Sequence, residues 1–412
     1  MKNRIFFTIC ALVAGLILSA AVAEAAPARS KNKKNALDGP VQEYRSRNFQ
    51  IYTDLSAEDS KQLLKELEEM LKLIAIYWGR PPRGIIECCV VDDLSKWPQE
   101  LLDKIDPEGL RKIREGAGVC ISTKMSQGEK FISKARVYAV AKGGVPLHEA
   151  VHAYCHQTFG RAGPRWYAEC MAEMGHYWSK GVKGVNVPDH VIRFLRNDKT
   201  RPLESLIDNE EKTGGSWEDY CWWWMLGHLM DNNPNYYAQY RSFGRMVLAG
   251  KQITFQDVFG PIAKELDFEL RLFRQNLQNG YRVDLCYWDW KKKFTDRLPS
   301  GRAMTATVLA DRGWQPSGLT VKAGSEYTTE ADGTWRIGGK KSDPIGADGA
   351  ESGHGKLVAA LFNDYQLGEE FELGKTGSFT PPTDGDLYLR CRVPWNKISD
   401  NSGKINVQIK LK

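Results

Sequence analysis

The chain has no long apolar run beyond its first 26 residues, no CxxC pair and no large excess of one charge. Without an apolar run of about 20 residues, we expect no membrane-spanning segment in the bulk of the chain. Without a CxxC pair, a cysteine-based metal site is not expected. The formal net charge of +6 is mild and dispersed over 412 residues, so the composition predicts no nucleic-acid partner.

The N-terminus has the pattern of a secretory signal peptide. Lys2 and Arg4 precede an almost uncharged apolar run over residues 5–22, and Ala23-Glu24-Ala25 is a small-x-small cleavage site. We therefore expect residues 1–25 to be removed and the mature protein to be secreted or to reside in the periplasm or cell envelope, without stable membrane insertion. An uncleaved anchor is the weaker alternative, because the run is barely long enough to span a bilayer.

Composition divides the remaining chain into two expected domains. Residues 26–47 are expected to form a flexible leader. Residues 48–290 combine two strand-like runs with long stretches of helical apolar spacing. Residues 291–301 are charged and end in Pro-Ser-Gly, which is typical of a linker. Residues 302–412 hold short strand-like runs between turn clusters, which predict an all-β sandwich. The predicted fold class is α+β, with a small mixed sheet and a mainly helical part followed by the sandwich.

The segment His148-Glu149-Ala150-Val151-His152 places two of only seven histidines four residues apart. Pro146 favours the start of a helix, in which both imidazoles lie on one face and can reach a single ion at about 2.0–2.1 Å. Glu149 lies about 100° around the helix axis, where a base for an activated water must stand. The pattern is typical of zinc metallopeptidases. The alternative is that the motif occurs by chance. The two histidines would then form a surface pair, or a buried histidine would have other partners.

A second segment, Trp166 to Glu173, supplies the other groups that a catalytic zinc site requires. Glu169 follows His152 by 17 residues, across a break at residues 160–164 that lets a second helix fold back. It is the candidate third ligand, which leaves one position of a tetrahedral ion open. Glu173 comes one turn later and is expected to accept a hydrogen bond from the ring N–H of a ligand histidine.

These two segments together resemble the motifs of the gluzincin metallopeptidases, and residues 48–278 are similar to a family of secreted bacterial gluzincin-like proteins. The strand "NFQIYTDL" and the later "YCWWWMLGHLM" carry the narrower resemblance. The resemblance implies that His148, His152 and Glu169 bind one zinc ion. It also implies that Glu149 is the general base and that Glu173 orients a ligand histidine.

Cys170 departs from this pattern, which usually has glycine or another small residue there. It is either silent or changes the packing behind Glu169. In an oxidising compartment, Cys155 and Cys170 are also a candidate disulfide pair.

Other residues are candidates for supporting roles. Tyr220 and His228 are both candidates for the donor that stabilises the developing oxyanion, and Tyr220 is preferred. The tryptophans of residues 222–224 are expected in a helix core. His156 lies about 6 Å beyond His152 along the helix, so a core or surface role is favoured over metal ligation. Tyr138 belongs to strand-like sequence before the motif, where gluzincins carry an edge strand that pairs with substrate.

The C-terminal part resembles the calcium-dependent galactose-binding bacterial lectin fold, through "WQPSGL", "GKLVAALF" and residues 400–407. That family binds Ca²⁺ with Asp, Thr and Asn oxygens. Asp400 and Asn401 match its Asn-Asn pair, but Arg392 stands near its expected upstream Asp and would repel the ion. We therefore favour a calcium-free accessory sandwich that docks on glycan or shields the first domain, with bound Ca²⁺ as the alternative.

Two classes of function remain open. The first is a secreted zinc metallopeptidase that hydrolyses a peptide or protein substrate, glycosylated or not, with water deprotonated by Glu149. The second is a non-catalytic zinc-containing protein that binds carbohydrate or a cell surface. The intact Glu149 favours the first class, because a structural zinc ion has no use for a base beside it.

Overall fold

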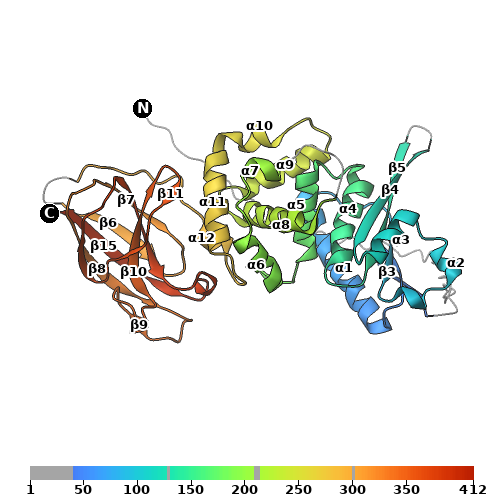
Figure 1. Ribbon diagram of the computed structural model, residues 1–412, viewed down its shortest axis with the longest axis horizontal. Coiled ribbons are helices and arrows are strands. Elements are labelled where there is room, and N and C mark those ends of the chain that lie inside the picture. Colours follow the sequence, from blue (N-terminus) through green and yellow to red (C-terminus); the bar gives the residue numbers. More distant parts are fainter. Residues whose placement is uncertain (1–39, 128–129, 208–213, 299–301) are drawn as a thin grey trace, which may run out of the picture. The chain divides into compact units, whose positions relative to one another are not determined.

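The computed structural model describes residues 40–127, 130–207, 214–298 and 302–412 (Figure 1). The predicted signal peptide, residues 1–25, lies outside this part of the chain. Among the helices described here, none has the combination of length and apolarity needed to cross a membrane. The architecture is mixed α and β, with a mainly helical middle and antiparallel sheets in the C-terminal part.

The N-terminal sheet is mixed, with strand order β1-β2-β3-β5-β4. The inner strands β2, β3 and β5 are parallel, and β1 and β4 are antiparallel edge strands. Along β3, Cys88 and Val90 belong to one core and Cys89 and Val91 to another, as expected for a strand covered on both faces. The strands are β1 (Gln42–Arg45), β2 (Phe49–Thr53), β3 (Ile86–Val91), β4 (Gly118–Gln127) and β5 (Lys130–Val140).

Strand β1 corrects the predicted leader. Only residues 40–47 of the expected leader, 26–47, lie in the described part of the chain, and Gln42–Arg45 pair with β2 through four antiparallel residue pairs. Val41, just before the strand, is buried in the core between the sheet and α3. The ordered domain therefore begins before residue 48, because the polar sequence of β1 occupies a sheet edge that requires little apolar burial.

Helices α1 and α4 cover one face of this sheet, with α5 packed behind α4, and α2 and α3 lie on the other face (Figure 1). Pro146 lies in the first turn of α4, and Gly160 ends the helix in the left-handed conformation with φ of 78°. The helices are α1 (Ala57–Trp78), α2 (Gln99–Leu102), α3 (Pro107–Arg114), α4 (Val145–Phe159), α5 (Arg165–His176), α6 (Asp189–Asn197), α7 (Leu203–Leu206), α8 (Trp217–Asn232), α9 (Tyr237–Leu248), α10 (Phe255–Phe259), α11 (Ala263–Gln275) and α12 (Val283–Cys286), with 3₁₀ turns η1 (Leu94–Lys96), η2 (Gly260–Ile262) and η3 (Trp395–Lys397).

Aromatic side chains dominate the helical core. Trp222, Trp223 and Trp224 of α8 are all buried, which confirms that this run is helix core. In the same core, Trp78 Nε1 donates a hydrogen bond of 2.9 Å to the hydroxyl of Tyr167. Gly244 of α9 lies against that pair, so close that an added Cβ atom would stand 1.7 Å from the Tyr167 hydroxyl oxygen.

The C-terminal part contains two antiparallel sheets whose inward side chains share one buried core, as in a β-sandwich. Along β15, Ile405, Val407 and Ile409 are fully buried, while the residues between them are exposed. One sheet contains β7 (Gln315–Val321), β10 (Lys356–Asn363), β11 (Gln366–Leu367), β12 (Phe371–Glu372) and β14 (Gly385–Arg392). The other contains β6 (Met304–Leu309), β8 (Tyr327–Arg336), β9 (Pro344–Ile345), β13 (Thr376–Phe379) and β15 (Ser402–Leu411).

The predicted linker, residues 291–301, is described only up to residue 298. Within it, Thr295 pairs with the sandwich: its backbone N–H donates to the carbonyl of Gly318, and its carbonyl accepts from the N–H of Thr320. This stretch of the linker is thus bonded to β7.

The close contact at Gly244 leads to a stability prediction. In Gly244→Ala, the added methyl group would displace the Tyr167 ring and break its hydrogen bond with Trp78. We expect the substitution to lower the free energy of unfolding by about 1–3 kcal/mol. Urea denaturation followed by tryptophan fluorescence measures the change. Gly346→Ala is the control, since an added Cβ there meets no atom within 4 Å. Equal stability of the two variants would contradict the packing described here.

Candidate metal centre

Three buried donor atoms from two helices form a nearly equilateral triangle. Nε2 of His148 and Nε2 of His152 lie 3.3 Å apart on α4. Each lies 3.3 Å from Oε2 of Glu169 on α5. The structure therefore brings together the three residues that the sequence predicts as metal ligands. Their donor atoms lie close enough together to hold one ion.

The size of this triangle fits a small tetrahedral ion. Ligand atoms that lie 2.0–2.1 Å from such an ion are separated by about 3.3–3.4 Å. The measured separations of 3.3 Å match that spacing. Two imidazole nitrogens and one carboxylate oxygen are also donors that suit zinc, and three protein ligands leave the fourth position open.

Glu149 lies on α4 beside the triangle and is buried. Its side chain packs against Gly118 of the edge strand β4: an added Cβ there would stand 2.8 Å from Glu149 Cγ and 3.0 Å from Oε1. Burial raises the pKa of Glu149, although the charges of His148 and His152 act in the opposite direction. Gly118 was not singled out in the sequence, because only the fold shows that a side chain there would occupy the space of Glu149.

Glu173 stands behind the triangle, on the far side of His148. Its Oε1 atom lies 2.9 Å from Nδ1 of His148, which is the nitrogen that faces away from the triangle. This is a close polar contact rather than a hydrogen bond, because the ring N–H is poorly aligned with the carboxylate oxygen. Burial lowers the pKa of His148, but Glu169 and Glu173 outweigh it, and the pKa lies well above its usual value.

His176 is a further member of this group that the sequence did not suggest. Its Nδ1 lies 3.6 Å from the same Glu173 oxygen, so Glu173 is shared by two imidazoles. The end of α5 reaches this position because Gly144 has no side chain: an added Cβ would stand 1.8 Å from the carbonyl oxygen of His176. The only sequence signal was its spacing of three residues after Glu173, which is common on helices.

The second oxygen of Glu169 accepts a backbone hydrogen bond. Gly214 N–H donates to Glu169 Oε1 at 2.7 Å, and Gly214 has a φ of 104°, which strongly favours glycine. Burial raises the pKa of Glu169, but the charge of His152 and the hydrogen bonds outweigh it, so the net pKa is lowered. This support from a loop far along the chain could not be deduced from residue spacing.

Cys170 is accommodated by a glycine on the neighbouring helix. It is fully buried between α5 and α8, and an added Cβ at Gly227 would lie 3.0 Å from Cys170 Cβ. Cys170 does not pair with Cys155, and all eight described cysteines are free thiols. The predicted pairing is therefore wrong: Cys170 faces Gly227, whereas Cys155 lies near Cys120 of the sheet.

Tyr220 and His228 lie in different surroundings. The Tyr220 ring meets the ring of His148 edge-on, with 5.7 Å between centroids, and its hydroxyl accepts a 3.1 Å hydrogen bond from Gly215 N–H. The His228 ring instead packs against Trp224 and Phe273, where burial lowers its pKa to about 4. Of the two candidate donors, only Tyr220 has a described contact with the triangle.

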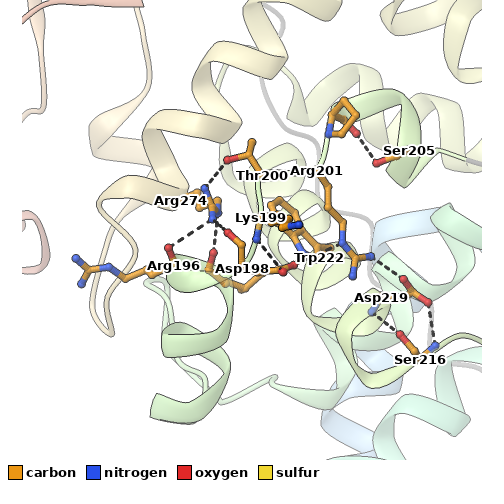
Figure 2. A network of polar contacts seen from close by, with 12 residues as sticks. Arg196, Asp198, Lys199, Thr200, Arg201, Ser205, Ser216, Asp219, Trp222 and Arg274 are labelled. Carbon is orange, nitrogen blue, oxygen red and sulfur yellow. Dashed lines mark hydrogen bonds and ion pairs between the residues drawn. The ribbon is translucent and has the colours of Figure 1, made fainter.

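A polar network positions the start of α8, which carries Tyr220 (Figure 2). Ser216 and Asp219 form a capping box at the first turn, with backbone-to-side-chain bonds of 3.0 and 3.2 Å. Arg201 donates a 2.7 Å hydrogen bond to Asp219, and Trp222 Nε1 donates to Asp198 at 2.9 Å. Arg274 of α11 donates to the backbone carbonyl of Asp198, so helices distant in sequence meet here.

Strand β4, rather than the strand that contains Tyr138, forms the free edge next to this site. Tyr138 lies in β5, which is paired on both sides by β3 and β4. Its side chain is buried against Gly109 of α3, on the face away from α4. The expectation that Tyr138 marks the edge strand is wrong, because the chain makes a hairpin and β5 enters the sheet interior.

The residues expected around a calcium ion in the C-terminal part have protein partners. Asn401 accepts a 3.0 Å hydrogen bond from Gly338 N–H and donates to the carbonyl of Ala310. Arg392 forms ion pairs with Glu370 and Glu372. Within the described ranges, the groups of three or more His, Cys, Asp or Glu residues able to hold an ion all include His148, so none lies in the sandwich.

Comparison with known proteins adds little to this geometry. No protein-family model matches the chain, and no curated protein matches it. One solved structure with a detectable likeness is described as an EclA N-terminal domain, a PllA-like lectin. It is 22% identical, with a TM-score of 0.24, and the match covers 27% of this chain and all of that chain.

The network of Figure 2 leads to a second stability prediction. Asp219→Ala removes half of the capping box and the partner of Arg201, and we expect a loss of about 1 kcal/mol in unfolding free energy. Thermal denaturation followed by circular dichroism measures the fall in Tm. The exposed Glu351, which has no described polar partner, supplies the control Glu351→Ala. If both variants melt with the parent, the network does not stabilise α8.

Proposed function

We propose that the protein is a secreted zinc-dependent metallopeptidase of gluzincin type. The single observation that supports this most is the triangle of His148, His152 and Glu169 with the buried Glu149 beside it. A structural metal site needs the triangle alone. A buried carboxylate next to three metal ligands has an energetic cost that a hydrolytic reaction would explain.

In this proposal, His148, His152 and Glu169 would hold a zinc ion beside Glu149. Glu173 and His176 keep the His148 ring oriented, and the N–H of Gly214 does the same for Glu169. Zinc, when bound, supplies the Lewis acidity that polarises the peptide carbonyl and acidifies the attacking water. Glu149 takes the proton from that water and later donates it to the departing amine nitrogen.

Tyr220 is the proposed donor to the developing oxyanion. Its ring contacts His148, and its hydroxyl is bonded to Gly215 N–H, so it is held next to the ligand cluster by the loop that precedes α8. The free edge of β4 next to Glu149 is the proposed place where the substrate backbone pairs.

The C-terminal sandwich is proposed to be an accessory domain without bound calcium. Asn401 is already hydrogen-bonded within the protein, and Arg392 is neutralised by two glutamates at the position where the lectin family would need an acidic ligand. Docking on glycan and shielding of the helical part remain its two proposed roles.

The metallopeptidase proposal is tested with Glu149→Gln. We expect the parent to contain about one zinc per chain, and the variant to keep the metal while its hydrolysis of an unfolded protein falls at least ~100-fold, the usual contribution of a general base. Inductively coupled plasma mass spectrometry and a casein assay give the two readouts, with the exposed Glu204→Gln as control. Equal cleavage by parent and Glu149→Gln would eliminate the peptidase. Zinc without any cleavage would favour the carbohydrate-binding alternative.

The role of Tyr220 has its own test. Tyr220→Phe removes only the hydroxyl, so we expect kcat to fall about 100- to 1,000-fold with little change in KM or zinc content. Steady-state kinetics on a fluorogenic peptide provide both constants. His228→Gln should leave kcat unchanged, because His228 lies in the aromatic core. If His228→Gln lowers kcat and Tyr220→Phe does not, His228 rather than Tyr220 is the oxyanion donor.

A further inference from the structure

A cavity of about 390 Å³ lies between the edge strand β4, the end of α4 and the loop that follows α9. Ser122 and Lys124 line it from β4, and His156 lines it from α4. The turn after α4 contributes Arg161, and the loop after α9 contributes Lys251. The proposed peptidase machinery uses none of these residues.

The charged residues that line this cavity are all basic. Four of its lining residues are basic types, and no aspartate or glutamate lines it. Lys124, Arg161 and Lys251 are exposed, and each lacks an ion-pair partner among the described residues. The Arg161 guanidinium lies against Gly250, where an added Cβ would stand 3.3 Å from it, so Arg161 and Lys251 are close together.

His156 has an unused polar atom at this place. Its Nδ1 is buried and has no hydrogen-bond partner in the described structure. Burial lowers the pKa of His156 to about 4, and the charges of His152 and Lys124 act in the same direction. An anion that enters the cavity would instead meet the cations that line it, because Lys124, Arg161 and Lys251 have no ion-pair partner among the described residues.

The cavity lies along the same strand and the same helix face as the metal centre. His156 follows His152 by one turn of α4, or about 6 Å along the axis, on the same face. On β4, Ser122 and Lys124 share the face of Gly118, which packs against Glu149, because side chains alternate along a strand. A substrate strand bound along β4 and passing Glu149 would therefore reach this cavity.

We infer that this cavity is a subsite for a carboxylate side chain of the substrate, two to four residues from the bond that is cut. The lining residues from His156 to Gly160 lie about 6–12 Å beyond His152 along the helix axis, which corresponds to about two to four residues of an extended peptide at about 3.3 Å each. The inference rests on the proposed peptidase function and specifies the class of peptide that it takes.

The direction of the substrate follows from the direction of β4. The strand runs from Gly118, next to Glu149, towards Lys124 at the cavity. Antiparallel pairing is the more stable ladder per residue, and it makes the substrate run from the cavity towards Glu149. The aspartate or glutamate of the substrate is therefore on the N-terminal side of the scissile bond.

The test uses the zinc-loaded full chain and internally quenched peptides that carry Glu or Gln at each of the second, third and fourth positions on either side of the scissile bond. We expect kcat/KM to be about tenfold higher for Glu at one N-terminal-side position, mainly through KM, as for one charge-assisted contact. The double variant Arg161→Gln/Lys251→Gln should cut the Glu and Gln peptides equally well. Lys61→Gln, an exposed lysine on α1, should keep the parent's preference. The preference should also weaken between 50 mM and 500 mM salt.

Different results would overturn the subsite and the peptidase proposal. Active parent protein that shows no preference for Glu, or prefers it only on the C-terminal side, overturns the subsite and leaves the peptidase intact. If no peptide is cut, fluorescence anisotropy of the labelled Glu and Gln peptides on the same proteins decides. Tighter binding of the Glu peptide that disappears in the double variant supports the subsite, and equal binding overturns it.

Discussion

Two buried imidazoles on α4 face buried carboxylates on α5, and this polar contact between neighbouring helices determines the layout around it. Groups of this kind are costly in an apolar interior unless each has a partner. Glu169 meets both histidines, Glu173 meets His148 from behind, and Gly214 N–H takes the remaining oxygen of Glu169. The close approach of the helices that makes this possible depends on glycine at position 144.

The aromatic core keeps these helices in place. Tyr167 lies on α5 two residues before Glu169, and its hydroxyl accepts from Trp78 of α1 while Gly244 of α9 closes over it. The polar network of Asp198, Arg201 and Asp219 similarly fixes the first turn of α8 and therefore Tyr220. Rigid supports of this sort would suit the proposed catalytic role, because small displacements of reacting groups slow a reaction considerably.

The cationic cavity and the candidate metal centre share their framework, because α4 and β4 contribute to both. Glu149 and His156 lie on one helix, and Gly118 and Lys124 lie on one edge strand. An unpaired strand edge can form backbone hydrogen bonds with a peptide of any sequence. Charged side chains beside that edge are the simplest way to add selectivity to such binding, since they distinguish peptides whose backbones are alike.

Local patterns in the sequence were sufficient for several features. The spacing of His148 and His152 defines one face of a helix because residues four apart lie one turn apart, and the alternation around Ile405 and Val407 identifies a half-buried strand. The separation between His152 and Glu169 showed that a second helix could fold back, though not that it does. Interactions between distant segments were inaccessible: Gly118 against Glu149, Gly214 on Glu169, His176 behind Glu173, and the interior position of the strand that carries Tyr138. These are set by how the sheet and helices pack, because hydrogen-bond partners and free space belong to tertiary contacts rather than to spacing along the chain.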